Sequence, residues 1–485
     1  MTFSDNGITS DSGVGIKFGR NAQGQITKVI DPDGKEIKYQ YDEAGDLVAV
    51  TDRKENTTRY GYSEERSHYL DEIIDPLGRS GVKTEYDENG RMTRLIDVNG
   101  EAVELNYDPD NSTQTIKDAL GNPTTYVYDD KGNVLTEIDP VGLITKRTYD
   151  ADNNMLTETI ITDESGESGY TTTYTYDKNG YETSITDPLG NTERYDYDSF
   201  GRLLSRTDAL GNTTTYTYYG RNIASVTDAL GNVVSYTYDR AGNRTSMTEG
   251  ENDVTYYEYD GRGNRTKKTD ALGNVTTYTH NTQGNVLTET MTLTTSEGVR
   301  TLVTTKTYDS NGNETSVLDA EGNLTQFEYD ANGNQTAIID SLGRRTVNRY
   351  DQKNNLTETI LPDDTPDDDS DNLRTSTTYD SNGNTTSVTD FAGNTTYYSS
   401  SATNLPTGMI YPDATPDDLS DNPTISVVYD KAGGMTSLVD ESGNTAAYEY
   451  DAAGRIIATR QYDADGNLIE SKTEYDAAGQ VIAKN

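Results

Sequence analysis

Two acidic segments of the chain carry the residue types and spacing that suit calcium binding. Residues 362–372 read PDDTPDDDSDN, and residues 412–422 read PDATPDDLSDN. Ca²⁺ takes roughly six to eight hard oxygen ligands, and clustered carboxylates and Asn carbonyl groups provide them. The pattern therefore predicts that Ca²⁺ is the one candidate cofactor, held by aspartates of these two segments: Asp367, Asp369, Asp371, Asp417 and Asp421.

The same segments depart from a calcium-binding loop in three ways. The glycine that follows the first ligands is missing, the closing glutamate is missing, and Leu419 replaces the middle ligand of the second copy. The alternative interpretation is a solvated acidic loop, which would resist edge-to-edge association of sheets.

The residues available for catalysis are few. The chain has two histidines, His68 and His280, and no cysteine. No Gly-x-Ser-x-Gly nucleophile elbow occurs, and paired carboxylates carry no information where every turn supplies an aspartate. His280 takes the place of a recurring tyrosine, which predicts a strand residue rather than a general base. We therefore predict that the protein is not an enzyme.

The composition excludes several classes of partner. The formal net charge is −42, which argues against binding to nucleic acid or to anionic membranes. No run approaches the ~20 apolar residues of a membrane helix, and residues 1–24 show no signal peptide. The absence of cysteine leaves the compartment open.

A repeat of 21 residues, seen from Tyr197 to Tyr218, organises the elements that position these side chains. Each unit holds a turn of the form Tyr-Asp-x-x-Gly, a short strand, a turn of the form Asp-x-x-Gly, and a second strand. We name these the Tyr-Asp turn and the Asp turn. In the run Thr213–Tyr218, the β-branched and aromatic residues fit a pleated strand, with Tyr216 and Tyr218 on one face.

The turn residues are the predicted structural sites. Glycine that closes a turn can take a positive φ without steric cost, which predicts turn glycines at Gly121, Gly142, Gly190, Gly211, Gly231 and Gly273. The Tyr-Asp pairs that open a unit include Tyr128–Asp129, Tyr197–Asp198, Tyr238–Asp239 and Tyr450–Asp451.

The repeat predicts an all-β protein of about twenty two-stranded hairpins. We expect residues 1–14 to be a polar N-terminal edge and residues 15–485 to be one continuous repeat array. A sheet of on the order of 40 strands must coil into a spiral or a hollow shell, since open sheets rarely exceed ~10 strands. Stacked tyrosines, such as Tyr216 and Tyr236, are expected to form a cross-strand aromatic ladder. Long spacings, such as the 28 residues from His280 to Tyr308, predict hairpins with longer arms or longer tips.

The unit resembles the YD repeat, also called the RHS repeat, whose pattern is roughly Tyr-Asp-x-x-Gly-Arg-Leu followed by Asp-x-x-Gly. Tyr197-Asp198 with Gly201-Arg202-Leu203 matches this pattern closely. Many copies carry Asn where the family often has Arg, as at Gly132-Asn133. The family forms spiral β-sheet shells in bacterial Rhs polymorphic toxins, in toxin-complex cocoons, in wall-associated proteins and in teneurins.

This resemblance implies a structural function. It implies a shell segment of a large secreted or cell-surface bacterial protein that encloses or displays a toxin or effector domain. The implied partner is a C-terminal toxin or effector domain. The alternative is an adhesin that binds carbohydrate or a partner protein through its Tyr-rich and acidic surfaces, since Tyr can stack on sugars.

Overall fold

The computed structural model describes residues 2–10, 13, 15–161, 169–250, 253–295, 298–362, 371–415, 418–462 and 467–485. Every helix or strand in this part of the chain is a β-strand, and the strands form one unclosed antiparallel sheet of 44 strands. The prediction of an all-β array of hairpins is confirmed. None of the described segments is a helix of the length and apolarity needed to cross a membrane.

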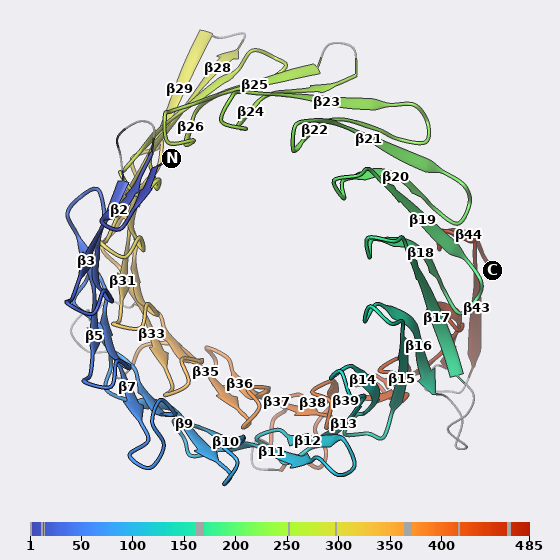
Figure 1. Ribbon diagram of the computed structural model, residues 1–485. Helices are drawn as coiled ribbons and strands as arrows, with labels where there is room; N and C mark the ends of the chain where they lie inside the picture. The colour runs from blue at the N-terminus through green and yellow to red at the C-terminus, as the bar shows by residue number, and fades with distance from the viewer. Residues whose placement is uncertain are drawn as a thin grey trace. The chain divides into compact units, whose positions relative to one another are not determined.

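The strands follow one another in chain order, as Figure 1 shows. The first are β1 Thr2–Ser4, β2 Gly7–Thr9, β3 Gly15–Arg20, β4 Ile26–Ile30, β5 Glu36–Tyr41, β6 Leu47–Thr51, β7 Thr57–Tyr62, β8 Leu70–Ile74, β9 Ser80–Tyr86, β10 Met92–Asp97, β11 Ala102–Asp108, β12 Thr113–Lys117, β13 Pro123–Tyr128, β14 Val134–Ile138 and β15 Ile144–Tyr149. The next are β16 Met155–Ile161, β17 Gly169–Tyr176, β18 Glu182–Thr186, β19 Thr192–Tyr197, β20 Leu203–Thr207, β21 Thr213–Tyr219, β22 Asn222–Thr227, β23 Val233–Tyr238, β24 Arg244–Glu249, β25 Asp253–Tyr259, β26 Arg265–Thr269, β27 Val275–His280, β28 Val286–Thr295, β29 Gly298–Tyr308 and β30 Glu314–Leu318. The last are β31 Leu324–Tyr329, β32 Gln335–Ile339, β33 Arg345–Tyr350, β34 Leu356–Ile360, β35 Arg374–Tyr379, β36 Thr385–Thr389, β37 Thr395–Ser400, β38 Pro406–Ile410, β39 Thr424–Tyr429, β40 Met435–Val439, β41 Thr445–Tyr450, β42 Ile456–Tyr462, β43 Leu468–Tyr475 and β44 Val481–Lys484.

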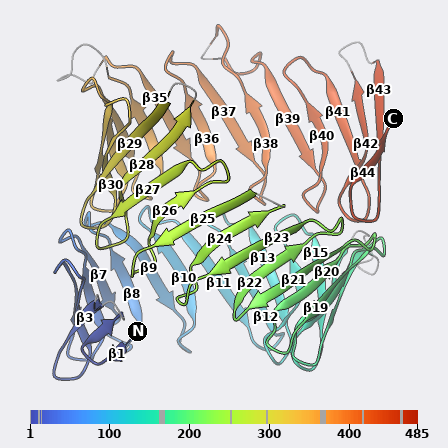
Figure 2. The ribbon, with the colours of Figure 1, turned by 90° about the horizontal axis from the view of Figure 1, so that it is seen from above.

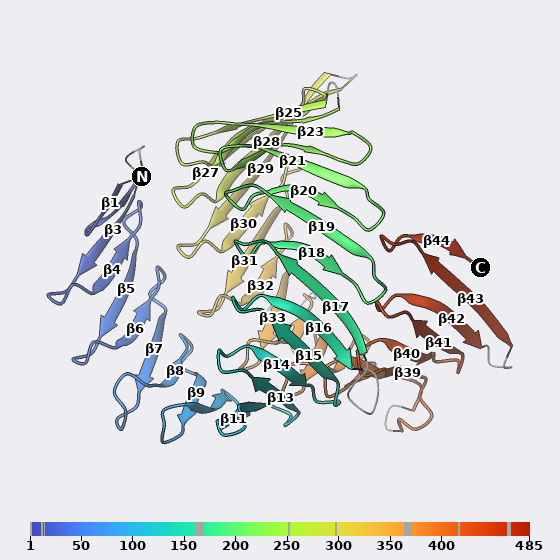
Figure 3. The same ribbon diagram turned by 45° about the vertical axis from the view of Figure 1, so that its right-hand side comes forward.

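The chain divides into two compact units. In the first unit, residues 1–101 form what we name the early row of hairpins, and residues 233–374 form the late row. In the second unit, the early row is residues 102–217 and the late row is residues 375–485. Residues 218–225 also belong to the first unit, and residues 226–232 also belong to the second. Figure 2 shows strands of both rows, and Figure 3 shows hairpins β13 to β20 of the second unit in chain order.

Antiparallel registers explain the two kinds of turn. β24 pairs with β23 on one side, where Tyr236 lies opposite Met247, and with β25 on the other. A β-bulge accompanies the Tyr-Asp turn, because the register shifts between Thr237 and Tyr238. The Tyr-Asp turns therefore lie at one edge of each row, and the Asp turns lie at the other.

The structure contradicts one expectation from the sequence, the ladder of paired tyrosines, and supports another, the lengthened hairpins. The expected ladder of directly paired tyrosines is wrong, because β24 separates the tyrosine-bearing strands β23 and β25. Of the two expected alternatives, longer arms or longer tips, β28 and β29 show longer arms, since they pair from Thr288 with Thr305 to Thr295 with Gly298. At the N-terminus, β1 and β2 form a hairpin that pairs with β3.

The sheet is a single layer with little buried side-chain volume. Among the described residues, Ile360 is the largest side chain that is fully buried. In β21 the exposure alternates, with Tyr216 and Tyr218 half-buried and Thr215 and Thr217 exposed. The stability of this fold must therefore rest heavily on hydrogen bonds at turns and between strands, rather than on a central core.

Candidate functional site

In the turns that begin with Asp, the Asp side chain holds the whole turn together. In the Tyr-Asp turn of β19 and β20, Asp198 Oδ1 accepts hydrogen bonds from the backbone N–H groups of Phe200 at 2.8 Å and Arg202 at 3.0 Å. Asp198 Oδ2 accepts from Arg202 Nε at 2.6 Å. In the next Asp turn, Asn212 takes the role of the arginine and donates to Asp208 Oδ2 at 2.8 Å. Asn and Arg are therefore alternative donors to the same carboxylate oxygen.

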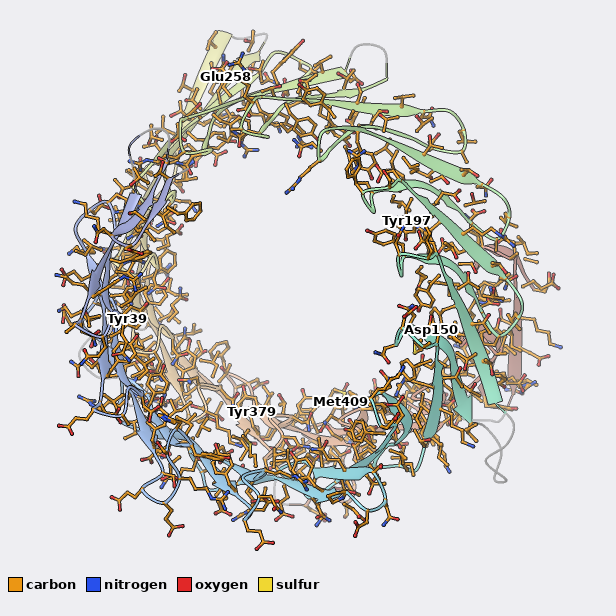
Figure 4. The ribbon with its side chains drawn as sticks, in the orientation of Figure 1. Tyr39, Asp150, Tyr197, Glu258, Tyr379 and Met409 are labelled. Carbon is orange, nitrogen blue, oxygen red and sulfur yellow. The ribbon has the colours of Figure 1, made fainter. Side chains whose placement is uncertain are left out.

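The same arrangement recurs at the other predicted pairs. Asp129, Asp239 and Asp451 each accept two backbone N–H groups on Oδ1. The predicted turn glycines have φ values of 86° at Gly121, 78° at Gly142, 89° at Gly190, 89° at Gly211, 88° at Gly231 and 83° at Gly273. Figure 4 shows Asp150 at the turn between β15 and β16, and Tyr197 where β19 ends.

The tyrosine of the Tyr-Asp turn ties its hairpin to the preceding one. Tyr450 Oη donates to the carbonyl oxygen of Met435 at 2.8 Å, and Tyr238 Oη donates to that of Ile223 at 2.8 Å. Two of the predicted tyrosines make a different contact in place of this hydrogen bond to a backbone carbonyl group. Tyr128 donates to Gln114 Oε1 at 3.0 Å, and the ring of Tyr197 stacks on Tyr181 with centroids 5.3 Å apart.

A feature that the sequence analysis missed is a line of hydrogen bonds between the early and late rows. We name it the lateral seam. In the first unit, Asn311 Nδ2 donates to Asp52 Oδ2 at 2.7 Å, and Asn332 Nδ2 donates to Asp75 Oδ2 at 2.8 Å. In the second unit, Asn382 Nδ2 donates to Asp118 Oδ2 at 2.7 Å.

At a fourth late-row turn the donor to the early row is a lysine. Lys353 Nζ lies 2.6 Å from Asp97 Oδ2 and 2.6 Å from Glu101 Oε2 in the first unit. Each late-row donor to these four aspartates is the third residue of its turn, counted from the residue that follows the tyrosine. Each aspartate opens an early-row Asp turn. The seam therefore follows one rule at all four places.

The seam changes the electrostatics of its aspartates. Burial raises the pKa of Asp75, but hydrogen bonds from Asn332 and from its own turn outweigh burial, so the pKa is lowered. Burial also raises the pKa of Asp52 and of Asp118, but hydrogen bonds outweigh it and lower both pKa values. The donors to Asp52 are first Asn56 of its own turn and then Asn311, and the donors to Asp118 are first Asn122 and then Asn382. For Asp270, the largest cause of the lowered pKa is instead the hydrogen bond from Asn274 of its own turn.

Asparagines that replace turn glycines are further functional residues. Asn354 has a φ of 67°, and its Oδ1 accepts from Asn334 Nδ2 at 2.7 Å and from Arg79 Nη2 at 2.9 Å. Asn404 repeats this role and accepts from Asn384 at 2.7 Å. The loss of glycine at a position that needs positive φ is the sequence signal that could have found them.

The predicted metal and histidine positions give no assembled site in the described residues. Asp367, Asp369 and Asp417 lie outside the described residues, while Asp371 and Asp421 are exposed. No group of three or more His, Cys, Asp or Glu side chains in the described part could hold a metal ion. His68 Nδ1 lies 2.7 Å from Asp46 Oδ1, and His280 pairs with Val286 as a strand residue.

The fold and turn motif define a β-hairpin repeat protein. The sequence matches the RHS repeat at residues 20–57, 128–168, 149–192, 197–221, 219–254, 259–299, 308–346, 329–366 and 429–467. These matches cover more than half of the chain, which therefore belongs to the RHS repeat family.

Solved structures show the same fold. The chain is similar to the crystal structure of TcdB2-TccC3, with 12% identity, a TM-score of 0.59 and coverage of 96% of this chain and 33% of that one. The crystal structure of TcdB2-TccC3 without its hypervariable C-terminal region gives 15% identity, a TM-score of 0.53 and coverage of 97% and 30%. The chain thus spans about a third of the length of these proteins. Comparison with curated protein sequences gave no significant match.

Proposed function

We propose that this chain is a non-enzymatic wall segment of a large secreted or cell-surface bacterial protein, and that the wall encloses or displays a toxin or effector domain. The lateral seam is the observation that carries the proposal. A single strip of hairpins has two free edges, whereas lateral hydrogen bonds such as Asn332 to Asp75 join two rows into a broader surface. The function is structural: hydrogen bonds in the turns hold each hairpin in shape, and hydrogen bonds of the lateral seam hold the early row against the late row.

Two further points support this role. The chain belongs to the RHS repeat family and shares its fold with TcdB2-TccC3 along 96% of its length, and both findings support a role as a wall of stacked hairpins. A net charge of −42 favours a soluble wall that does not adhere to nucleic acid or anionic lipid. The proposed partner is an enclosed or fused C-terminal toxin or effector domain.

The test begins with the coding sequence on both sides of residues 1–485. The complete product is then purified and treated with a protease. We expect a following domain that resists cleavage in the wild type and is cleaved faster in the double variant Asn332→Ala/Asn382→Ala. Asn89→Ala is the matched control, because Asn89 holds the same turn position at an exposed site of the early row. The absence of any such domain, or equal cleavage in all three proteins, would contradict the proposal.

The adhesin alternative rests on exposed tyrosines. Tyr219 is 71% exposed and Tyr256 is 56% exposed, so both could stack on a sugar. The tyrosines of the turns serve an internal role instead, as the bond from Tyr450 to Met435 illustrates. A glycan array without a binder would remove this alternative.

A further inference from the structure

A cavity of about 610 Å³ lies at the seam of the second unit. The early row contributes Asp187 and Pro188, and the late row contributes residues 432–435 and 450–454, among others. The volume falls within the range of small-molecule sites, which is roughly 300–1,000 Å³. The cavity therefore has room for a ligand. At other positions of the seam, side chains from the late row occupy the corresponding space.

The first reason for the cavity is a missing lateral donor. The Asn382–Asp118 contact gives the starting point for matching turns of the two rows. When the turns are counted along both rows from there, Ala453 is the residue that corresponds to Asp187, and both residues line the cavity. Asp187 keeps the bonds of its own turn, from the N–H groups of Leu189 and Asn191 to Oδ1 and from Asn191 Nδ2 to Oδ2. An alanine cannot supply the additional N–H that Asp118 receives.

The second reason is a missing donor within a turn. Asp430 opens a late-row turn and also lines the cavity. Gly434 stands four residues later, where many other turns have Asn or Arg, and it supplies only its backbone N–H to Asp430 Oδ1 at 2.7 Å. A Cβ at position 434 would lie 2.7 Å from Asp430 Oδ2, so the carboxylate occupies the space that a side chain would need.

The charges around the cavity favour a cation. Glu158 and Asp451 also line it, but Arg147 and Arg455 neutralise them. No Lys or Arg lines the cavity itself, so Asp187 and Asp430 are left without a cationic partner among the described residues.

The walls also favour an alkyl group. Ile160, Tyr170 and Met435 line the cavity together with Tyr450. An aromatic ring and a thioether both pack well against a methylene chain, and the aromatic ring also attracts a nearby cation. The seam of the first unit provides an internal example, since the Lys353 ammonium group lies between two carboxylates at 2.6 Å from each.

We propose that this cavity binds a primary alkylammonium group, with Asp187 and Asp430 as hydrogen-bond acceptors and the Tyr170 and Met435 side chains against the alkyl chain. The group could belong to a lysine side chain of a polypeptide or to a free alkylamine. A second cavity of about 460 Å³ repeats the pattern at Asp208 and Ala478, but there Arg206 already supplies a cation. The proposal does not depend on the wall function.

The test uses calorimetry and NMR on the full chain with two pairs of probes. n-Butylamine is compared with n-butanol, and the peptide acetyl-Gly-Lys-Gly-amide is compared with its norleucine counterpart. We expect the ammonium probes to bind and the neutral probes not to bind, with binding weakened by added salt. Binding of both ammonium probes identifies a site for small amines, and binding of the peptide alone identifies a polypeptide ligand.

Variants locate the site. Asp187→Asn keeps an oxygen for its own turn but loses the charge, so ammonium binding should weaken about tenfold. Ala453→Lys should place its own ammonium in the cavity and abolish binding. Ala241→Lys is the matched control, with the same turn position away from the cavity, and should bind as the wild type does. Equal binding of neutral and ammonium probes, no binding at all, or unchanged binding in Asp187→Asn and Ala453→Lys would overturn the proposal.

Discussion

Replacement of Asn332 tests whether the lateral seam stabilises the protein. Asn332 Nδ2 donates to the carboxylate of Asp75 at 2.8 Å and to Asn354 Oδ1 at 3.2 Å. A hydrogen bond to a charged group contributes about 1.5–3 kcal/mol when buried, and the partial exposure of this site reduces that figure. We expect Asn332→Ala to lower the local free energy of opening by about 1–2 kcal/mol.

The replacement Asn332→Asp should lower the local free energy of opening more than Asn332→Ala does, because it places a second carboxylate next to that of Asp75. At ~3 Å and an effective dielectric constant of ~20, their repulsion is at most about 6 kcal/mol. Proton uptake limits this cost, since a like charge raises the pKa of one carboxyl group. Because the pKa of one carboxyl group is raised in the folded state of this variant, the variant gains stability as the pH falls. The wild-type seam loses stability as the pH falls, because the pKa of Asp75 is lowered in the folded state.

The assay is hydrogen–deuterium exchange of peptides from β8, β9, β31 and β32, because repeat arrays can open locally without complete unfolding. A loss of 1.4 kcal/mol corresponds to about tenfold faster exchange. Asn89→Ala is the control at the same turn position in the early row. Wild-type exchange in Asn332→Ala, or an equal effect of Asn89→Ala, would refute the assignment of the seam as a stabilising contact.

Four further predictions concern turns, tyrosines, pH and calcium. Gly211→Val should destabilise its hairpin by ~1 kcal/mol or more, because φ is 89° there while a Cβ would meet no atom within 4 Å. Gly211→Asn should cost clearly less, and equal melting of both variants would contradict the backbone explanation. Tyr450→Phe should cost about 1 kcal/mol in urea unfolding through the lost bond to Met435, whereas Tyr219→Phe at an exposed site should cost nothing measurable. The pKa values of Asp52 and Asp75 are lowered in the folded state, so their stabilisation is present above pH ~4 and is lost as the pH falls through the lowered values. Protection factors, which correct exchange for its intrinsic pH dependence, that stayed constant from neutral pH to pH ~2 would contradict this. If the acidic segments bind Ca²⁺, calorimetry should give a binding heat and the melting temperature should rise, and Asp371→Asn/Asp421→Asn should reduce both effects; no heat and no shift would exclude the site.

The lateral seam was invisible to sequence analysis for a physical reason. Its partners, such as Asn332 and Asp75, are 257 residues apart. Which turn meets which depends on how far the strip advances with each hairpin, summed over many hairpins, and no local window contains that quantity. The aromatic ladder failed for a related reason, because the strand between two tyrosine-bearing strands sets their distance.

The sequence by itself determined the all-β class, the hairpin repeat and the chemistry of each turn. These features are local, since Asp198 bonds only to residues up to four positions away. The donors of the seam, the role of Asn354 as an acceptor between turns and the cavity at Asp187 were decided only by the tertiary structure. Each of them needs two segments far apart in sequence to lie side by side, which is a property of packing and not of any single repeat.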